Sequence, residues 1–363
     1  MFKFITETFS SLVGGSYLGV DIGTTSIKVV EVGIGVEKPV LRNYGILESY
    51  EHLDRPTAAL QGSGLALVER ETGELLKLVI ERMRTRARSV VATVPPFAVF
   101  SSYLEVPIVS EKEIARAMEY QARAVVPLPV NEVVVEWFML GGFEDEKGVH
   151  KQKILLVATP KELIARYERI AAIAGLKLRG LEIEGASLAR SVARGERGEV
   201  LLVDLGARST GLYILDEGRV KISSQTDFSA GSLTRAVAQG MGIASRRAEE
   251  LKRRRGLVGT GGEYELSTLM LPYVDVILGE VRRFRDTYAE SYHGTIKKAL
   301  LTGGGSNLLG LVEYASSELG IPVALGAPFA RLSYDPFIEP LTAELSGLLA
   351  ASIGAGIKQF VDE

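Results

Sequence analysis

Two aspartates, Asp21 and Asp204, occupy the same place in two similar stretches of sequence. GVDIGTTSIKVVEV in the first half and LVDLGARSTGLYIL in the second each run from an apolar strand through Asp and Gly into a polar turn and another strand. A carboxylate at a strand end can hold a water of hydrated Mg²⁺, and the amides and hydroxyls of such a turn suit an anion. The repeated pattern indicates an internal duplication.

One such hairpin alone is most often a plain turn, in which Gly, Thr and Ser satisfy local geometry. Two of them facing each other predict a phosphate clamp between two lobes, because each turn offers its donors from the opposite side. Lys28 would add a point charge near a phosphate. The expected clamp residues are Asp21, Gly23, Thr24, Thr25, Ser26 and Lys28 on one side and Asp204, Gly206, Arg208, Ser209 and Thr210 on the other.

Two further segments fit a nucleotide. In TGGGSN, Gly303, Gly304 and Gly305 lie between a strand and a helix, where a nucleotide can approach the backbone and the helix N-terminus favours negative charge. In AEELK, Glu249 and Lys252 lie about one helical turn apart, and the carboxylate could accept hydrogen bonds from two ribose hydroxyls. A surface Glu–Lys pair is the ordinary alternative for AEELK.

Composition narrows the chemistry. The 363-residue chain has no Cys and only His52, His150 and His293, which excludes disulfides and thiolate metal sites and disfavours a multi-histidine site. Its 42 Lys+Arg against 45 Asp+Glu give a net charge of −3, so we expect no nucleic-acid partner. Neither a GxxxxGK[ST] loop nor a GxGxxG turn occurs in the right context, which argues against P-loop and dinucleotide-binding folds.

The order of apolar and polar segments predicts an α/β protein of two lobes with an inserted α+β subdomain. Between the two hairpins, helix patterns such as SEKEIARAMEYQARA alternate with strand patterns such as NEVVVEWFML and KQKILLVAT. The predicted division is an N-terminal arm at 1–15, a first lobe at 16–100 and 179–198, the inserted subdomain at 101–178, a second lobe at 199–340, and a C-terminal helix at 341–363 that packs on the first lobe.

The sequence does not suggest a membrane span. No run approaches the roughly 18 to 20 apolar residues that a spanning helix needs, although the mean hydropathy is +0.16. Apolar residues of the N-terminal arm fall on one side of a helical wheel, but the polar side lacks the basic residues of interfacial helices. We expect a cytoplasmic protein whose arm docks on its own domain or is disordered, with a membrane or partner contact as the alternative. The apolar arm residues are Phe2, Ile5, Phe9, Leu12 and Val13.

The ordered segments resemble the superfamily of actin, sugar kinases and heat-shock ATPases. DIGTTSIKVV is similar to its first phosphate segment, VDLGARSTGL to its second and TGGGSNLLGL to its adenosine segment. An insert at this position is similar to the FtsA and PilM families, and GTTSIKVVEV, SEKEIARAMEYQARAVVPLPVNEVVVEW and LEIEGASLAR most resemble the PilM family of actin-like type IV pilus assembly proteins. The resemblance spans nearly the whole chain and implies a duplicated actin-like (ribonuclease H-like) ATPase fold.

That resemblance implies ATP and Mg²⁺ as ligands, with at most slow hydrolysis. It implies that Asp21 and Asp204 hold Mg²⁺ through water and that Glu184, in EIEGASLA, orients the attacking water. Ser-Ala-Gly-Ser at 229–232 and Arg208 depart from the family's pattern, and they bear on hydrolysis more than on binding. The ATP-binding residues it implies are Asp21, Gly23, Thr24, Thr25, Ser26, Lys28, Asp204, Gly206, Ser209, Gly231, Glu249, Lys252, Gly303, Gly304 and Gly305.

The resemblance also implies a partner. In the PilM family, a groove between the first lobe and the insert receives the cytoplasmic N-terminal peptide of the inner-membrane protein PilN, within the assembly platform of a type IV pilus or a related type II secretion system. The protein would then be peripheral to the inner membrane through its partners, and self-association stays open.

Two alternatives compete with this hypothesis. A sugar-kinase-type phosphotransferase is one, because DIGTTS is nearly the same as the start of that family. The insert and the lack of a clear base-bearing sugar pocket argue against it. An FtsA-like cell-division protein is the other. That family ends in a basic amphipathic tail, whereas this chain ends in LSGLLAASIGAGIKQFVDE, which predicts a packed helix.

Overall fold

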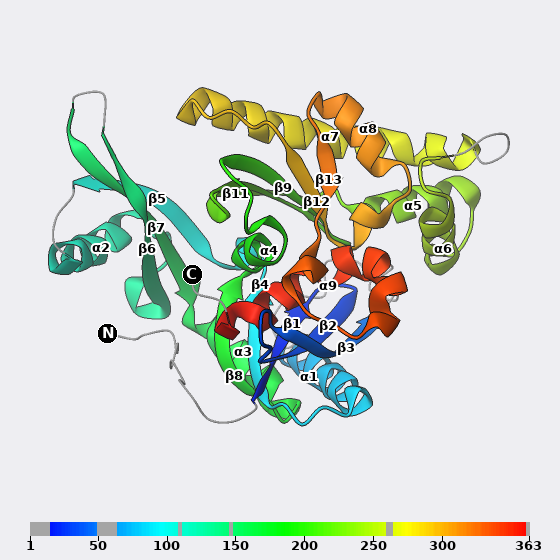
Figure 1. Ribbon diagram of the computed structural model, residues 1–363, viewed down its shortest axis with the longest axis horizontal. Coiled ribbons are helices and arrows are strands. Elements are labelled where there is room, and N and C mark those ends of the chain that lie inside the picture. The colour runs from blue at the N-terminus through cyan, green and yellow to red at the C-terminus, as the bar shows by residue number, and fades with distance from the viewer. Residues whose placement is uncertain (1–14, 49–63, 108–110, 145–147, 259–263, 361–363) are drawn as a thin grey trace.

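The computed structural model describes residues 15–48, 64–107, 111–144, 148–258 and 264–360. The chain forms two five-stranded sheets and one three-stranded sheet. In Figure 1 the second five-stranded sheet and its helices lie above the first, and the three-stranded sheet stands to the left. The predicted arm at 1–15 lies outside the described residues except for its last residue.

The first sheet has the strand order β3-β2-β1-β4-β8. The strands β1, β2 and β3 are antiparallel neighbours, whereas β4 runs parallel to β1, and β8 parallel to β4. Alternating valines and leucines of these strands pack with two helices, α1 and α3, in a single core. The elements are β1 (Ser16–Ile22), β2 (Ser26–Gly33), β3 (Val40–Glu48), β4 (Ser89–Val94), β8 (Lys177–Ile183), α1 (Gly64–Met83) and α3 (Lys161–Ile173).

The three-stranded sheet has the order β5-β7-β6 and carries α2 on one face. Its elements are β5 (Phe100–Pro107), α2 (Glu111–Val125), β6 (Val133–Glu144) and β7 (His150–Pro160). The prediction placed α3 in this insert, but Tyr167, Ile170 and Ala171 of α3 are buried in the core of the first sheet. Helical periodicity shows that one face of α3 is buried but not which sheet covers it. By packing, the inserted unit ends with β7.

The second sheet has the order β11-β10-β9-β12-β13. Helices α5, α6, α7 and α8 contribute to its largest core. The three glycines lie between a strand and a helix as predicted, but a short 3₁₀ turn (Gly304–Asn307) and the left-handed Gly310 separate them from α8. The elements are β9 (Glu199–Leu205), β10 (Thr210–Asp216), β11 (Arg219–Thr226), α5 (Ala230–Met241), α6 (Ser245–Arg255), α7 (Tyr264–Tyr292), β12 (Ala299–Thr302), α8 (Leu311–Leu319) and β13 (Val323–Leu325).

The two five-stranded sheets share one topology. In each, the third, second and first strands form an antiparallel meander, and two later strands extend the sheet in parallel beyond the first strand. This equivalence pairs β1 with β9 and β2 with β10, so Asp21 and Asp204 end equivalent strands. We call the first sheet with α1 and α3 the first lobe, and the second sheet with α5 to α8 the second lobe.

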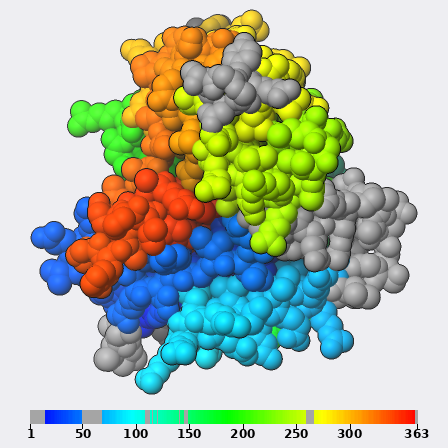
Figure 2. Space-filling view, turned by 90° about the vertical axis from the view of Figure 1, so that its right-hand side faces the viewer, coloured from blue at the N-terminus to red at the C-terminus, as the bar shows by residue number. Residues whose placement is uncertain are grey.

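Helix α9 (Thr342–Ile357) lies between the lobes, as the red segment in Figure 1 shows. Leu349 and Ile353 pack on the first sheet, while Ala350 and Ala351 join a core with strands of the second sheet. The close approach requires glycine: a Cβ on Gly354 would clash with the backbone of α4 (Glu184–Leu188). In the space-filling view the C-terminal segment follows the boundary between the lobes (Figure 2).

Among the described residues, the stretch Pro336–Phe360 is long and apolar enough to cross a membrane, with 61% of its most apolar window buried inside the protein. Its buried residues form the interlobe packing of α9, so we interpret it as a core helix.

Candidate functional site

The two hairpins meet at a cluster of four ionisable residues, Asp21, Lys28, Glu184 and Asp204, which we call the carboxylate cluster. Asp21 and Lys28 are cross-strand partners on β1 and β2, and the Lys28 Nζ donates to Asp21 Oδ2 at 2.8 Å. Glu184, the first residue of α4, is hydrogen-bonded to Asp204 at the end of β9. The structure therefore brings together the two aspartates that the repeat singled out.

Burial governs the charge of the cluster. Burial, followed by the negative charges of Asp204 and Asp21, raises the pKa of Glu184 well above its ordinary value. Burial also raises the pKa of Asp204 to about 6. Burial alone would lower the pKa of Lys28, but the neighbouring carboxylates, Asp21 first, raise it above its usual value. The raised pKa of Glu184 disfavours its ionised form, and the Lys28 ammonium pairs with the Asp21 carboxylate.

The turns of both hairpins can receive an anion. In the first turn, the amide of Gly23 closes onto the Ser26 carbonyl at 2.9 Å, and a Cβ on Gly23 would lie 3.2 Å from that oxygen. Within the described part of the chain, the amides of Thr24 and Thr25 make no backbone hydrogen bond. Successive free amides in a turn form an anion-binding concavity.

The second turn repeats this geometry. The amide of Gly206 closes onto the Ser209 carbonyl at 3.1 Å, and a Cβ on Gly206 would come within 2.8 Å of that oxygen. The exposed Arg208 stands at the tip of this turn. Gly231, at the start of α5, donates its amide to the Ala207 carbonyl at 3.1 Å, which joins the turn to the helix.

The three consecutive glycines allow close packing at the end of β12. Gly303 has a φ of +83°, in the region that favours glycine, and a Cβ there would clash with the Asp204 carboxylate. A Cβ on Gly305 would lie 2.6 Å from Ala230 at the start of α5. These glycines therefore let the strand end of β12, the second hairpin and α5 approach one another.

Glu249 and Lys252 form a buried pair on α6, so the surface-pair alternative is wrong. They are 8% and 5% exposed, and the Lys252 Nζ lies 2.7 Å from Glu249 Oε2. Lys252 also donates to the Ala230 carbonyl at 3.1 Å, and Thr234 donates to the Glu249 carboxylate. A buried carboxylate with several donors is a rigid polar group facing α5 rather than a solvated side chain.

Sequence reasoning missed three residues that border the site, Thr93, Arg253 and Glu48. Thr93 on β4 donates to Asp21 Oδ1 at 3.1 Å. Arg253 donates to Glu249 at 2.8 Å and to Glu48 of β3 at 2.9 Å, so it links the two lobes. The position of Arg253 next to Lys252 is the one signal in the sequence that could have indicated its role. The contacts of Thr93 with Asp21 and of Arg253 with Glu48 join residues far apart along the chain.

The donor set fits a nucleotide better than a directly bound metal. Among the described residues, no group of three or more His, Cys, Asp or Glu side chains could hold a metal ion. The Lys28 ammonium already occupies one side of Asp21. The free turn amides, the close-packed glycines and the Glu249–Lys252 pair are instead the groups that phosphates and a ribose require.

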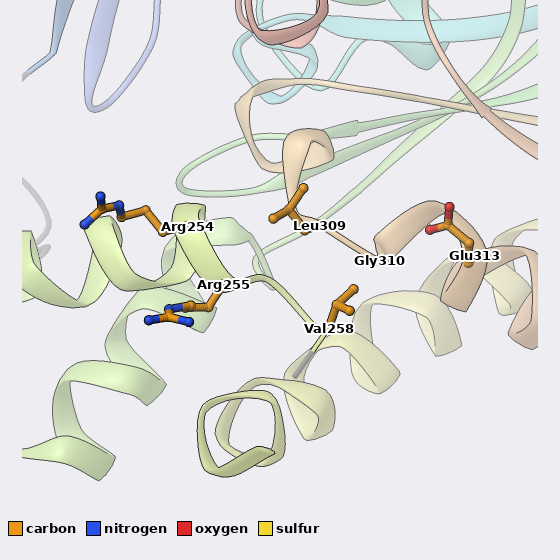
Figure 3. A pocket seen from close by; sticks show the side chains of 6 residues that line it. All are labelled: Arg254, Arg255, Val258, Leu309, Gly310 and Glu313. Atoms are coloured by element: carbon orange, nitrogen blue, oxygen red, sulfur yellow. The ribbon is translucent and has the colours of Figure 1, made fainter. Parts of the chain in front are cut away.

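A hollow of about 440 Å³ borders the outer side of α6, lined by Arg254, Arg255, Val258, Leu309, Gly310 and Glu313. Figure 3 shows both arginine side chains extending away from Leu309 and Glu313. The Leu257 amide donates to the Leu309 carbonyl at 2.7 Å, which ties the end of α6 to the segment after the three glycines. The hollow contains no residue of the carboxylate cluster, and its exposed arginines lie beyond the buried Glu249–Lys252 pair.

The family model described as "Type IV pilus assembly protein PilM" matches residues 19–359. The chain belongs to the PilM family. The match covers both hairpins, the insert, the three glycines and α9. It favours the pilus hypothesis over the sugar-kinase and cell-division alternatives.

The structure is similar to solved members of the actin-like fold. It matches a chain of the "PilM-PilN type IV pilus biogenesis complex" with a TM-score of 0.78 at 23% identity, covering 95% of this chain and 99% of that one. It also matches MreB5 of Spiroplasma citri bound to AMPPNP, with a TM-score of 0.50 at 13% identity and coverage of 94% and 95%. The fold is therefore actin-like, as the resemblance implied.

A relative in sequence is the cell division protein FtsA of Enterococcus hirae. It is 23% identical over 353 residues, which cover 86% of this chain and 78% of that protein. The PilM family and this relative agree in placing the chain among actin-like proteins.

Proposed function

We propose that this protein is an ATP-binding scaffold of a type IV pilus assembly platform, or of a related type II secretion system, on the cytoplasmic side of the inner membrane. Its partner would be the cytoplasmic N-terminal peptide of a PilN-like membrane protein. The observation that carries the proposal is the family match over residues 19–359, which includes both converging hairpins. The fold shared with the PilM–PilN complex supports the choice of partner.

The geometry supports ATP as the ligand. Amides of the two turns, including the free ones of Thr24 and Thr25, would bind the phosphates, Lys28 would add a positive charge, and Glu249 would accept the ribose hydroxyls. The chain around the three glycines would receive the adenosine. Asp21 and Asp204 would hold waters of Mg²⁺, which would supply charge neutralisation for the phosphates.

The charge of the cluster favours binding over turnover. A water-activating base must be unprotonated at working pH, whereas burial and two neighbouring carboxylates raise the pKa of Glu184 and so disfavour its ionised form. Glu184 would then orient a water by hydrogen bonding rather than take up its proton. ATP would act mainly as a structural and regulatory ligand, stabilising the closed arrangement of the lobes by its differential affinity for that arrangement.

The experiment that tests the proposal has two arms. The first measures Mg·ATP binding by calorimetry for the wild type and for Asp204→Ala, with Asp227→Ala as a control on the β11–α5 connection. We expect the wild type to bind and Asp204→Ala to bind at least tenfold more weakly. Equal affinity in both variants would remove Asp204 from the site.

The second arm captures partners from detergent-solubilised membranes of the source organism with the tagged full chain, with and without Mg·ATP. We expect a PilN-like protein in the bound fraction, identified by mass spectrometry. A synthetic peptide of its cytoplasmic N-terminus should then compete for the chain. Capture of division proteins instead, or release of ADP that depends on one added sugar, would overturn the proposal.

A further inference from the structure

The hydroxyl of Tyr213 has no hydrogen-bond partner within the described part of the chain, although this side chain is 0% exposed. Thr302 is 1% exposed, and its hydroxyl also lacks a partner among the described residues. A buried polar group without a partner costs folding free energy, so each such group in a folded protein needs an explanation.

Both hydroxyl groups lie beside the carboxylate cluster. Gly211 on β10 and Thr302 on β12 are the cross-strand neighbours of Asp204. Tyr213 follows Gly211 by two residues and shares its face of the sheet. A Cβ on Gly211 would come within 2.8 Å of the Tyr213 hydroxyl, so this hydroxyl points back along β10 toward Asp204.

The other side of the Tyr213 ring touches the first residues of α4. A Cβ on Gly185 would clash with the ring, so the ring lies directly against the backbone next to Glu184. Burial, followed by the charges of Glu184, Asp204 and Asp21, raises the pKa of Tyr213 well above its ordinary value. The hydroxyl therefore keeps its proton and can donate a hydrogen bond.

We infer that Tyr213 is a positioning residue of the nucleotide site, whose hydroxyl donates to a water molecule shared with the Glu184 carboxyl. A buried water typically makes about three hydrogen bonds to otherwise unsatisfied polar groups. Tyr213 on the second sheet and Glu184 at the start of α4 supply two of these hydrogen bonds, so the water joins the second sheet to α4. The inference rests on the proposed ATP-binding function and adds one residue to its site.

The test is Tyr213→Phe, which removes the hydroxyl and retains the ring packing against Gly185 and Gly211. If the hydroxyl donates to the shared water, the Tm of the free protein should fall by about 2 °C. The affinity for Mg·ATP should fall roughly fivefold, as for the loss of one hydrogen bond. If the hydroxyl has no partner, its removal relieves a penalty, so an increased Tm with unchanged affinity would overturn the inference.

Tyr288→Phe is the matched control. The Tyr288 hydroxyl donates to Glu199, at the opposite end of β9 from Asp204. Its loss should lower the Tm and leave the Mg·ATP affinity unchanged. The same pattern in Tyr213→Phe would reduce Tyr213 to a packing residue and also overturn the inference.

Failure of the proposed function would appear separately, as a wild type that does not bind Mg·ATP. The Tm of the free Tyr213→Phe protein would still show whether the hydroxyl has a partner. An increased Tm in that variant would overturn the inference.

Discussion

Glu182→Gln removes one charge from a buried ion cluster that fixes the start of α4. The Glu182 carboxylate accepts hydrogen bonds from Arg190 at 2.7 and 3.0 Å, from Lys358 at 3.0 Å and from Ser187. Its side chain is 5% exposed. These contacts join β8, α4 and the end of α9. Because Glu182 lies two residues before Glu184, the ion cluster supports the candidate site.

The magnitude follows from the pKa. Burial alone would raise the pKa of Glu182, but Arg190 and Lys358 lower it from 4.5 to about 2. One pKa unit corresponds to about 1.4 kcal/mol, so the ionised carboxylate contributes about 3 kcal/mol to folding stability at pH 7. Because the folded pKa lies below the unfolded one, this contribution is complete above about pH 5 and is lost as pH falls toward 2, with roughly 1.5 kcal/mol left at pH 3.

Urea denaturation of the wild type and Glu182→Gln at pH 7 and pH 3 measures this contribution. We expect the variant to be less stable by about 3 kcal/mol at pH 7 and by about half as much at pH 3. The control Glu280→Gln breaks a surface pair with Arg283, whose side chain is 72% exposed, and should cost less than about 0.5 kcal/mol. A Glu182→Gln effect below about 1 kcal/mol at pH 7, or one of equal size at both pH values, would refute the reasoning.

Two further substitutions test the packing of the lobes. Gly354→Ala should destabilise the protein by about 3 kcal/mol or more in urea denaturation, because its Cβ would clash with α4. The control Gly279→Ala in α7, which has open space around it, should be neutral or stabilising by up to about 1 kcal/mol. A similar effect of both changes would contradict the close packing of α9. Lys252→Met should lower the folding stability by about 2 kcal/mol, since Arg253 alone would remain as a cation beside the buried Glu249. Adding Glu249→Gln should recover at least about 1 kcal/mol of that stability. Simple additivity in this double-mutant cycle would show that the pair is not coupled.

The local pattern of the sequence predicted the hairpins because strand, turn and strand follow each other within a few residues. Asp21 and Asp204 could be found this way, since each stands at a strand end before a glycine turn. The contact of Thr93 with Asp21 joins residues 72 positions apart, and that of Arg253 with Glu48 joins residues 205 apart. Neither has a periodic signal, because the fold alone brings these side chains together.

The placement of α3 and the role of Tyr213 could not be predicted for a related reason. An amphipathic pattern reveals that a helix has a buried face, but two sheets compete to cover it. Tyr213 appears in the sequence as one more apolar residue of a buried strand, with no signal for a free hydroxyl. Its interest arises from Gly185 and Gly211, which lack the side chains that would otherwise occupy the space of its ring.

Helix α9 packs against both halves of the candidate site and so fixes the distance between them. A Cβ on Gly347, in α9, would clash with the Gly303 carbonyl. On β1, Gly19 lies two residues before Asp21, and a Cβ there would clash with the carbonyl of Ser352 in α9. The helix thus contacts the strand of the first aspartate and the glycines around the second, without side chains between them. Because a packed helix is nearly incompressible, any movement of one lobe displaces α9 against the other. A nucleotide that bridges the lobes would therefore act on the same boundary that α9 occupies.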